Sequence, residues 1–135
     1  MLKDAWKVVV LGEARVGKTS LIARLCLDQF SDRVESTVNA AVTKKDIILS
    51  SGGAIRLNIW DTAGQEKYHA MLTSYYKNAL GALIVFDLTD VTSFEIMKAW
   101  IKELNEECPG ISIVIVGNKC DMIKNRHVGF TECIK

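Results

Sequence analysis

The sequence has a single proline and almost no net charge. Its 17 Lys and Arg residues are offset by 16 Asp and Glu residues, which leaves a formal net charge of +1. A chain so balanced lacks the broad basic surface that nucleic acids and anionic membranes attract. No apolar run approaches the roughly 20 residues that cross a bilayer. We therefore expect no nucleic-acid partner and only an indirect contact with membranes.

The cysteines also lack a recognisable pattern. The four of them show neither C-x-x-C spacing nor the disulfide framework of a small secreted domain. The first six residues lack the apolar segment of a secretory signal. These absences favour reduced thiols in a cytoplasmic protein. The length of 135 residues suits one domain, to which we assign residues 1–135.

Strand patterns recur along the chain. Continuous apolar runs at residues 7–11, 79–87 and 111–117 predict buried parallel strands. Two further strand-like runs, at residues 42–49 and 54–60, are separated by a short Ser-Gly-Gly turn. They predict an antiparallel hairpin.

Helical patterns lie between the strands. Amphipathic spacing predicts one helix over residues 18–27, with Leu21, Ile22 and Leu25 on one face, and another over residues 93–107, which Ser93 caps. The second helix is expected to bury Phe94, Met97, Trp100, Ile101 and Leu104. Weaker patterns predict a polar loop, an irregular helix and the start of a last helix, at residues 29–41, 66–77 and 128–135. This alternation predicts an α/β fold with a doubly wound, mostly parallel sheet and one antiparallel strand, whose ligand lies at the carboxyl ends of the strands.

Residues 12–19 fit the pattern G-x-x-x-x-G-K-[ST], between a predicted strand and a predicted helix. Gly12 and Gly17 let the backbone curl until several N–H groups point at one anion, and the start of the helix adds its dipole. Lys18 suits the β- and γ-phosphates, and the Thr19 hydroxyl suits Mg²⁺. The simpler alternative is a glycine turn before an ordinary helix. The residues expected at the nucleotide are Gly12, Ala14, Arg15, Val16, Gly17, Lys18, Thr19 and Ser20.

A second candidate segment, Asp-Thr-Ala-Gly-Gln, follows the strand that ends near residue 60. Asp61 at a strand end suits the Mg²⁺ site, where it would hold one of the ion's waters. Gly64 would let its N–H approach a γ-phosphate, and Gln65 could orient an attacking water as the catalytic residue. An ordinary loop is the alternative.

The third segment, Asn-Lys-Cys-Asp, follows the last predicted strand. The Asp121 carboxylate can accept two parallel hydrogen bonds from N1–H and the 2-amino group of guanine, and adenine lacks this pair of donors. Lys119 can lie along the base, and Asn118 can brace neighbouring loops. The segment therefore favours guanine, with a polar turn or an ATP-binding site as weaker alternatives.

Two residues of the polar loop complete the candidate site. Thr37 could give its hydroxyl to Mg²⁺ and its N–H to a γ-phosphate, so that the loop orders only with the triphosphate. Phe30 could pack on the edge of the base. An ordinary core position is an equally good interpretation of Phe30 from its sequence context alone.

The three motifs occur together and in order, and on these grounds the chain resembles the Ras-like small GTPases, which have the P-loop NTPase fold. Thr37 lies 18 residues after Thr19 and Phe30 lies 11 after it, as in that family. Motifs similar to those of Rab proteins lie at residues 60–68, 75–79 and 85–89. Residues 35–41 and 65–70 look most like the endosomal subgroup of Rab-five and Rab-twenty-one.

The resemblance implies binding of GTP and GDP with Mg²⁺, slow GTP hydrolysis and a role in vesicular, endosomal membrane traffic. It also implies an exchange factor, a GTPase-activating protein and effectors that contact residues 37–42 and 60–76. Three residues depart from the family pattern: Ala14 stands where many members have glycine or serine, Asn39 replaces a glycine, and Val42 replaces an aromatic residue. These departures bear on the rate of hydrolysis and on the effector surface.

The chain also ends before the family's last strand, last helix and prenylated tail. From the resemblance we expect this chain alone to be less stable, and to bind nucleotide more weakly, than a longer form. An alternative function follows: a non-enzymatic interaction protein, or an incomplete gene product, that keeps the motifs but binds nucleotide poorly.

Overall fold

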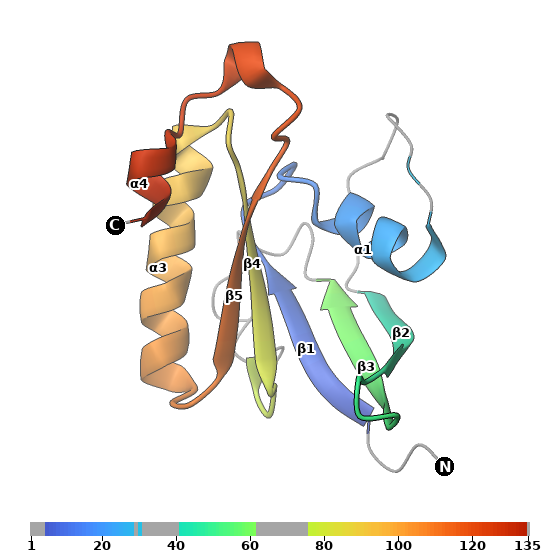
Figure 1. The fold of residues 1–135 in the computed structure, drawn as a ribbon. Helices are drawn as coiled ribbons and strands as arrows, with labels where there is room; N and C mark the ends of the chain where they lie inside the picture. Colours follow the sequence, from blue (N-terminus) through green and yellow to red (C-terminus); the bar gives the residue numbers. More distant parts are fainter. Residues whose placement is uncertain (1–4, 29, 31–40, 62–75, 135) are drawn as a thin grey trace.

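A computed structural model describes residues 5–28, 30, 41–61 and 76–134. Its centre is a five-stranded sheet in the order β2-β3-β1-β4-β5 (Figure 1). Among the described strands, β2 and β3 alone pair antiparallel, and the other pairs are parallel. The strands are β1 Ala5–Leu11, β2 Ala41–Ile48, β3 Ala54–Asp61, β4 Gly81–Asp87 and β5 Ser112–Asn118. The predicted mixed sheet with one antiparallel hairpin is confirmed, whereas most of the predicted helix at residues 66–77 lies outside the described residues.

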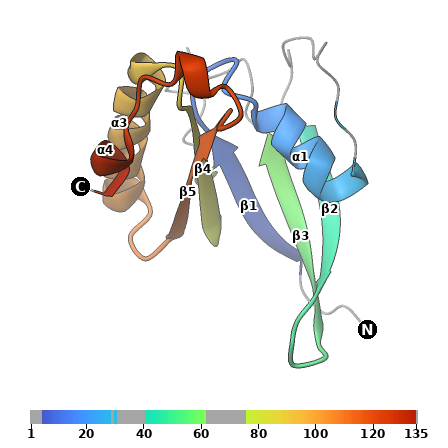
Figure 2. The same cartoon turned by 45° about the horizontal axis from the view of Figure 1, so that its top comes forward.

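Helices lie on both faces of the sheet. Figures 1 and 2 show α3 (Val91–Glu107) and the short α4 (Phe130–Ile134) on one side, and α1 (Lys18–Leu27) on the other. A 3₁₀ turn, Ile123–Asn125, precedes α4. No described helix is long and apolar enough to cross a membrane.

The central strand β1 supplies side chains to both faces, because successive residues of a strand point to opposite sides. Val9 packs in the core under α3, with Trp100 and Leu104 of that helix. Val10 packs in the opposite core, with Ile22 of α1. Burying one such side chain contributes about 1.5–3 kcal/mol to the free energy of unfolding. Packing on both faces therefore holds β1 in place, and with it the start of the loop that follows.

The start of α3 differs from the prediction. Ser93 is not its cap: the helix begins at Val91, and the extended residue Asp90 accepts a hydrogen bond from the Thr92 N–H at 3.0 Å. Ser93 instead lies buried in the first turn, where its hydroxyl donates to the Asp90 carbonyl at 2.7 Å. Asp90, Thr92 and Ser93 are all potential caps, and the carboxylate one residue before the helix accepts an N–H of the first turn.

Three predictions of burial were wrong, because the side chains concerned are exposed or only half-buried. The segment predicted as a third buried strand forms β5, which among the described residues pairs only with β4, and Val114 and Ile115 are 58% and 48% exposed. Leu25 is exposed because α1 packs toward β2 and β3 with its other face, and Ile101 is only half-buried at the margin of α3's contact. An apolar run alone does not reveal which strand lies at an edge.

Candidate functional site

The candidate site lies at one edge of the sheet. Because β1, β3, β4 and β5 run parallel, the loops that follow them meet at their shared carboxyl edge. Gly12 follows β1, and Asp61, Asp87 and Asn118 are the last residues of β3, β4 and β5. The motifs that lie far apart in the sequence are therefore brought together by strand register.

The loop between β1 and α1 has the geometry of an anion cradle. Gly12 and Gly17 have φ values of 148° and 99°, and Arg15 between them is also left-handed at 68°. A Cβ on Gly12 would lie 2.2 Å from the Val85 carbonyl oxygen, so the loop can pass this close to β4 only with glycine. The loop leads directly into the N-terminus of α1, where backbone N–H groups and the helix dipole favour an anion.

Lys18 lies beneath this loop. Its side chain is buried, and its ammonium donates to the carbonyl oxygens of Gly12 at 2.7 Å and Glu13 at 3.0 Å. These bonds hold a positive charge against the loop that the sequence assigns to phosphate. The arrangement suits the neutralisation of a phosphate whose oxygens accept from the loop amides.

Thr19 and Asp61 bring two oxygen atoms together beside the loop. The Thr19 hydroxyl donates to Asp61 Oδ2 at 2.6 Å, and the Asp61 carboxylate is buried at the end of β3. Hydroxyl and carboxylate oxygens are the ligands and water-holding partners that Mg²⁺ prefers, so this pair fits the ion. Thr37, the other predicted magnesium residue, lies outside the described residues.

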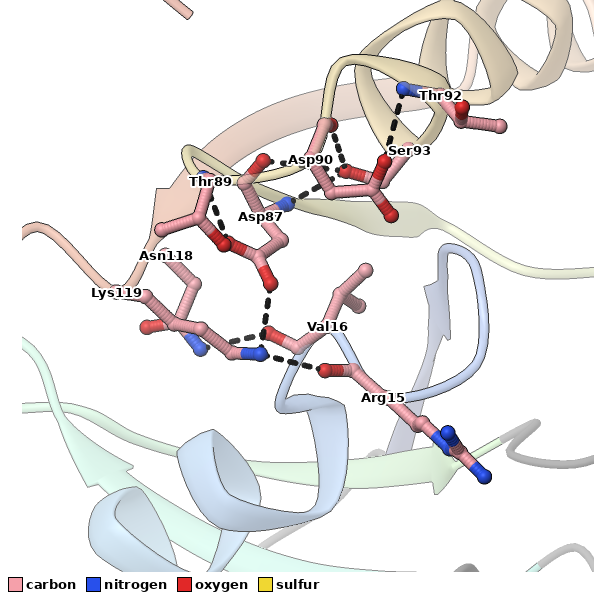
Figure 3. Close-up of polar contacts among 9 residues, drawn as sticks. All are labelled: Arg15, Val16, Asp87, Thr89, Asp90, Thr92, Ser93, Asn118 and Lys119. Atoms are coloured by element: carbon pink, nitrogen blue, oxygen red, sulfur yellow. Dashed lines mark hydrogen bonds and ion pairs between the residues drawn. The ribbon is translucent and has the colours of Figure 1, made fainter. Parts of the chain in front are cut away.

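The loop after β5 is bound to the loop after β1. Asn118 Nδ2 donates to the Val16 carbonyl oxygen at 2.8 Å, and Lys119 Nζ donates to the Arg15 carbonyl oxygen at 2.9 Å (Figure 3). A Cβ on Gly17 would lie 2.3 Å from the same Asn118 amide nitrogen. The predicted base-binding and phosphate-binding segments are thus held side by side, and Asp121 follows them on the exposed surface.

One residue of this candidate site, Asp87, was not predicted from the sequence. Asp87 Oδ2 lies 2.7 Å from Lys119 Nζ, and its Oδ1 accepts from the Thr89 N–H and hydroxyl at 2.8 and 2.6 Å (Figure 3). Burial raises the pKa of Asp87, but the bonds from Lys119 and Thr89 outweigh this and hold the pKa below its usual value. The available signal was an aspartate at a strand end, on the edge that also carries Asp61 and Asn118.

The remaining predicted residues divide into three groups. Phe30 is 64% exposed, so it is not a core residue and its ring remains accessible to a ligand. Ala14 and Arg15 are exposed on the loop, whereas the Val16 side chain is buried and Ser20 is partly buried. Gly64 and Gln65 lie outside the described residues, as Thr37 does.

Comparison with known proteins finds a consistent set of relatives. Residues 7–135 match the sequence model described as "Ras family". The chain is 45% identical over 129 residues to the Ras-related protein Rab-21 of Homo sapiens. The aligned region covers 95% of this chain and 57% of that protein. The chain is also 45% identical over 122 residues to the GTP-binding protein ypt5 of Schizosaccharomyces pombe, covering 90% of this chain and 58% of that protein. The chain therefore spans less than two thirds of the length of these relatives.

Proposed function

Because the chain belongs to the Ras family, as a Rab-type small GTPase of the Rab5/Rab21 subgroup, we propose that it is a guanine-nucleotide-dependent switch that binds GTP and GDP and hydrolyses GTP slowly. The observation that carries this proposal is the pair of bonds from Asn118 to Val16 and from Lys119 to Arg15. These bonds hold the loop proposed to bind the base beside the loop proposed to bind phosphate, and a nucleoside phosphate needs this arrangement.

The phosphates bind to the loop amides and to Lys18. Lys18 already faces the loop carbonyls, so it needs only a local movement to exchange them for phosphate oxygens. Mg²⁺, when bound, neutralises phosphate charge, and Thr19 and Thr37 would hold it while Asp61 orients one of its waters. The Asp121 carboxylate selects guanine, and Phe30 packs against the base.

Hydrolysis depends on charge stabilisation and on one positioned water. Lys18 and the loop amides stabilise the charge that develops on the phosphates, and Gln65 orients the water. Arg15 is exposed on the outer side of the loop, so we assign the additional arginine to a GTPase-activating partner.

The cellular role follows from the family. We propose that residues 37–42 and 60–76 form the surface that exchange factors and effectors contact, and that the chain acts in vesicular traffic of endosomes from the cytoplasmic side. Val42, which is 46% exposed on β2, belongs to this surface.

Replacing Thr19 with asparagine should weaken GTP binding roughly tenfold more than GDP binding, because the γ-phosphate depends more on Mg²⁺ and on the hydroxyl that holds it. Thr19→Ser keeps the hydroxyl and should retain most of the affinity for both nucleotides. A displacement assay with labelled GDP measures the two affinities. Equal losses for GTP and GDP in Thr19→Asn would remove Thr19 from the magnesium site.

Replacing Gln65 with leucine should leave GTP bound and slow its hydrolysis roughly ten- to a hundredfold, since leucine cannot orient a water. Single-turnover release of phosphate measures the rate. Asn105→Leu makes the same kind of change on the exposed face of α3 and should have no effect. Ala14→Gly tests whether the methyl group on the loop already slows the parent; an unchanged rate would show that it does not.

The second candidate, an interaction protein that binds nucleotide poorly, is favoured by one observation. The apolar residues Val114 and Ile115 are exposed on β5. They form an apolar surface at the edge of the sheet that a partner protein could cover. Hydrolysis of GTP by the purified chain, slowed by Gln65→Leu, supports the switch. Absence of both hydrolysis and guanine-nucleotide binding would leave the interaction protein.

A further inference from the structure

Asp87 joins three parts of the fold. It is the last residue of β4, it faces Lys119 of the loop after β5, and it lies next to the start of α3 (Figure 3). Its own N–H donates to the Ser93 hydroxyl at 2.9 Å, inside the first turn of that helix. The helix in turn is anchored in the core by Trp100 and Leu104. Asp87 is therefore held by a helix that is anchored in the core.

Both carboxylate oxygens of Asp87 are occupied. Oδ1 accepts from the Thr89 N–H and hydroxyl, which leaves Oδ2 directed at Lys119. The Asp87 side chain is almost fully buried, and the Lys119 side chain is one-third exposed. A pair screened this much from water interacts more strongly than an exposed ion pair, and its geometry is set by Thr89 rather than by solvent.

The ammonium of Lys119 bridges two partners. One N–H reaches Asp87, and another reaches the Arg15 carbonyl oxygen of the phosphate-binding loop. Lys119 and Arg15 both have left-handed backbones, at φ values of 64° and 68°. Non-glycine residues hold this conformation only where their surroundings impose it. The Asp87–Lys119–Arg15 chain is one such constraint, and it acts on both nucleotide loops at once.

We propose that Asp87 is a positioning residue for nucleotide binding. Through Lys119 it holds the base-binding loop against the phosphate-binding loop, so that the two are already spaced for a nucleotide before one arrives. This inference rests on the proposed guanine-nucleotide site. Preorganisation of this kind acts mainly on the release of the ligand. The contacts from Asp87 through Lys119 end at Arg15 and do not involve Thr19 or Asp61. They should therefore affect GDP and GTP binding equally.

The test measures the release of fluorescent GDP and GTP analogues from Asp87→Asn. This variant keeps the size of the side chain and the acceptor for Thr89 but loses the charge that holds Lys119. Release of both nucleotides should become about ten- to a hundredfold faster, the range expected for losing one charged hydrogen bond. Asp46→Asn makes the same change in the exposed Asp46–Arg56 pair of the hairpin and should leave release unchanged.

Testing Asp87→Asn in a second variant, Lys119→Met, separates a positioning role of Asp87 from a general loss of protein stability. Lys119→Met removes the ammonium, so adding Asp87→Asn to it should produce little further acceleration. If Asp87→Asn accelerates release as much in that background as in the parent, or not at all in the parent, the inference is overturned. Thr89→Val, which loosens Asp87 without removing it, should give an intermediate rate and replaces Asp87→Asn if that variant does not fold. A parent chain that binds no guanine nucleotide would overturn the proposed function itself, and the inference with it.

Discussion

Replacing Asp121 with asparagine should reverse the base preference of the chain, from guanine toward xanthine. The carboxylate is complementary to the N1–H and 2-amino donors of guanine, whereas the asparagine side chain offers a donor to the 2-oxygen of xanthine. A site built to pair a base edge rejects the mismatched edge strongly, because polar groups are left unpaired. The ratio of GDP to xanthosine diphosphate affinity should fall at least about a hundredfold.

Isothermal calorimetry with GDP, xanthosine diphosphate and ADP measures this reversal. Asp28→Asn is the matched control, because Asp28 is an exposed aspartate with a left-handed backbone at the end of α1, outside the site. It should leave all affinities unchanged. A parent chain that binds ADP as tightly as GDP would contradict the assignment of Asp121 to the base.

Replacing Gly12 with alanine should destabilise the fold by about 3 kcal/mol or more and should abolish nucleotide binding. The new Cβ would lie 2.2 Å from the backbone oxygen of Val85, in a core strand that cannot move aside, and φ at this position is 148°. Crowding in a packed core and a forbidden backbone each cost about 1–3 kcal/mol. Thermal denaturation should show a midpoint roughly 10 °C lower.

Gly52→Ala separates the two causes. Gly52 also has a positive φ, 85°, but a Cβ there meets no heavy atom within 4 Å. Backbone strain alone should therefore lower the free energy of unfolding of this variant by about 1 kcal/mol, and its nucleotide affinity should be unchanged. Equal destabilisation by the two variants would show that the close approach of the loop to β4 is not what requires Gly12.

The architecture could be predicted from the sequence where the local signal is strong. The apolar run ending at Leu11, the glycine loop and the following helix are each recognisable within a few residues, and the structure has them in that form. The antiparallel hairpin was predictable for the same reason, since two strand-like runs flank a short glycine turn. Strand register then explains how Asn118 reaches the carbonyl of Val16, 102 positions away.

What the sequence did not reveal depends on tertiary context. The exposure of Val114 and Ile115 depends on which strand lies at the edge of the sheet. The cap of α3 depends on which of several neighbouring polar side chains meets the helix N-terminus, and Asp90 rather than Ser93 does so. The role of Asp87 depends on a lysine from another loop, and no local pattern reports such a partner.

Every other proposal depends on the binding of guanine nucleotides by this chain at the loops after β1 and β5. The most direct measurement is thermal denaturation of the purified chain with Mg²⁺ and increasing GDP, compared with ADP. A ligand that binds only the folded state stabilises it by about 2.7 kcal/mol at a hundred times its dissociation constant, so even a weak site becomes visible at high concentration. A midpoint that rises with GDP but not with ADP is the predicted result. A midpoint that GDP leaves unchanged, or that ADP raises equally, would contradict the account.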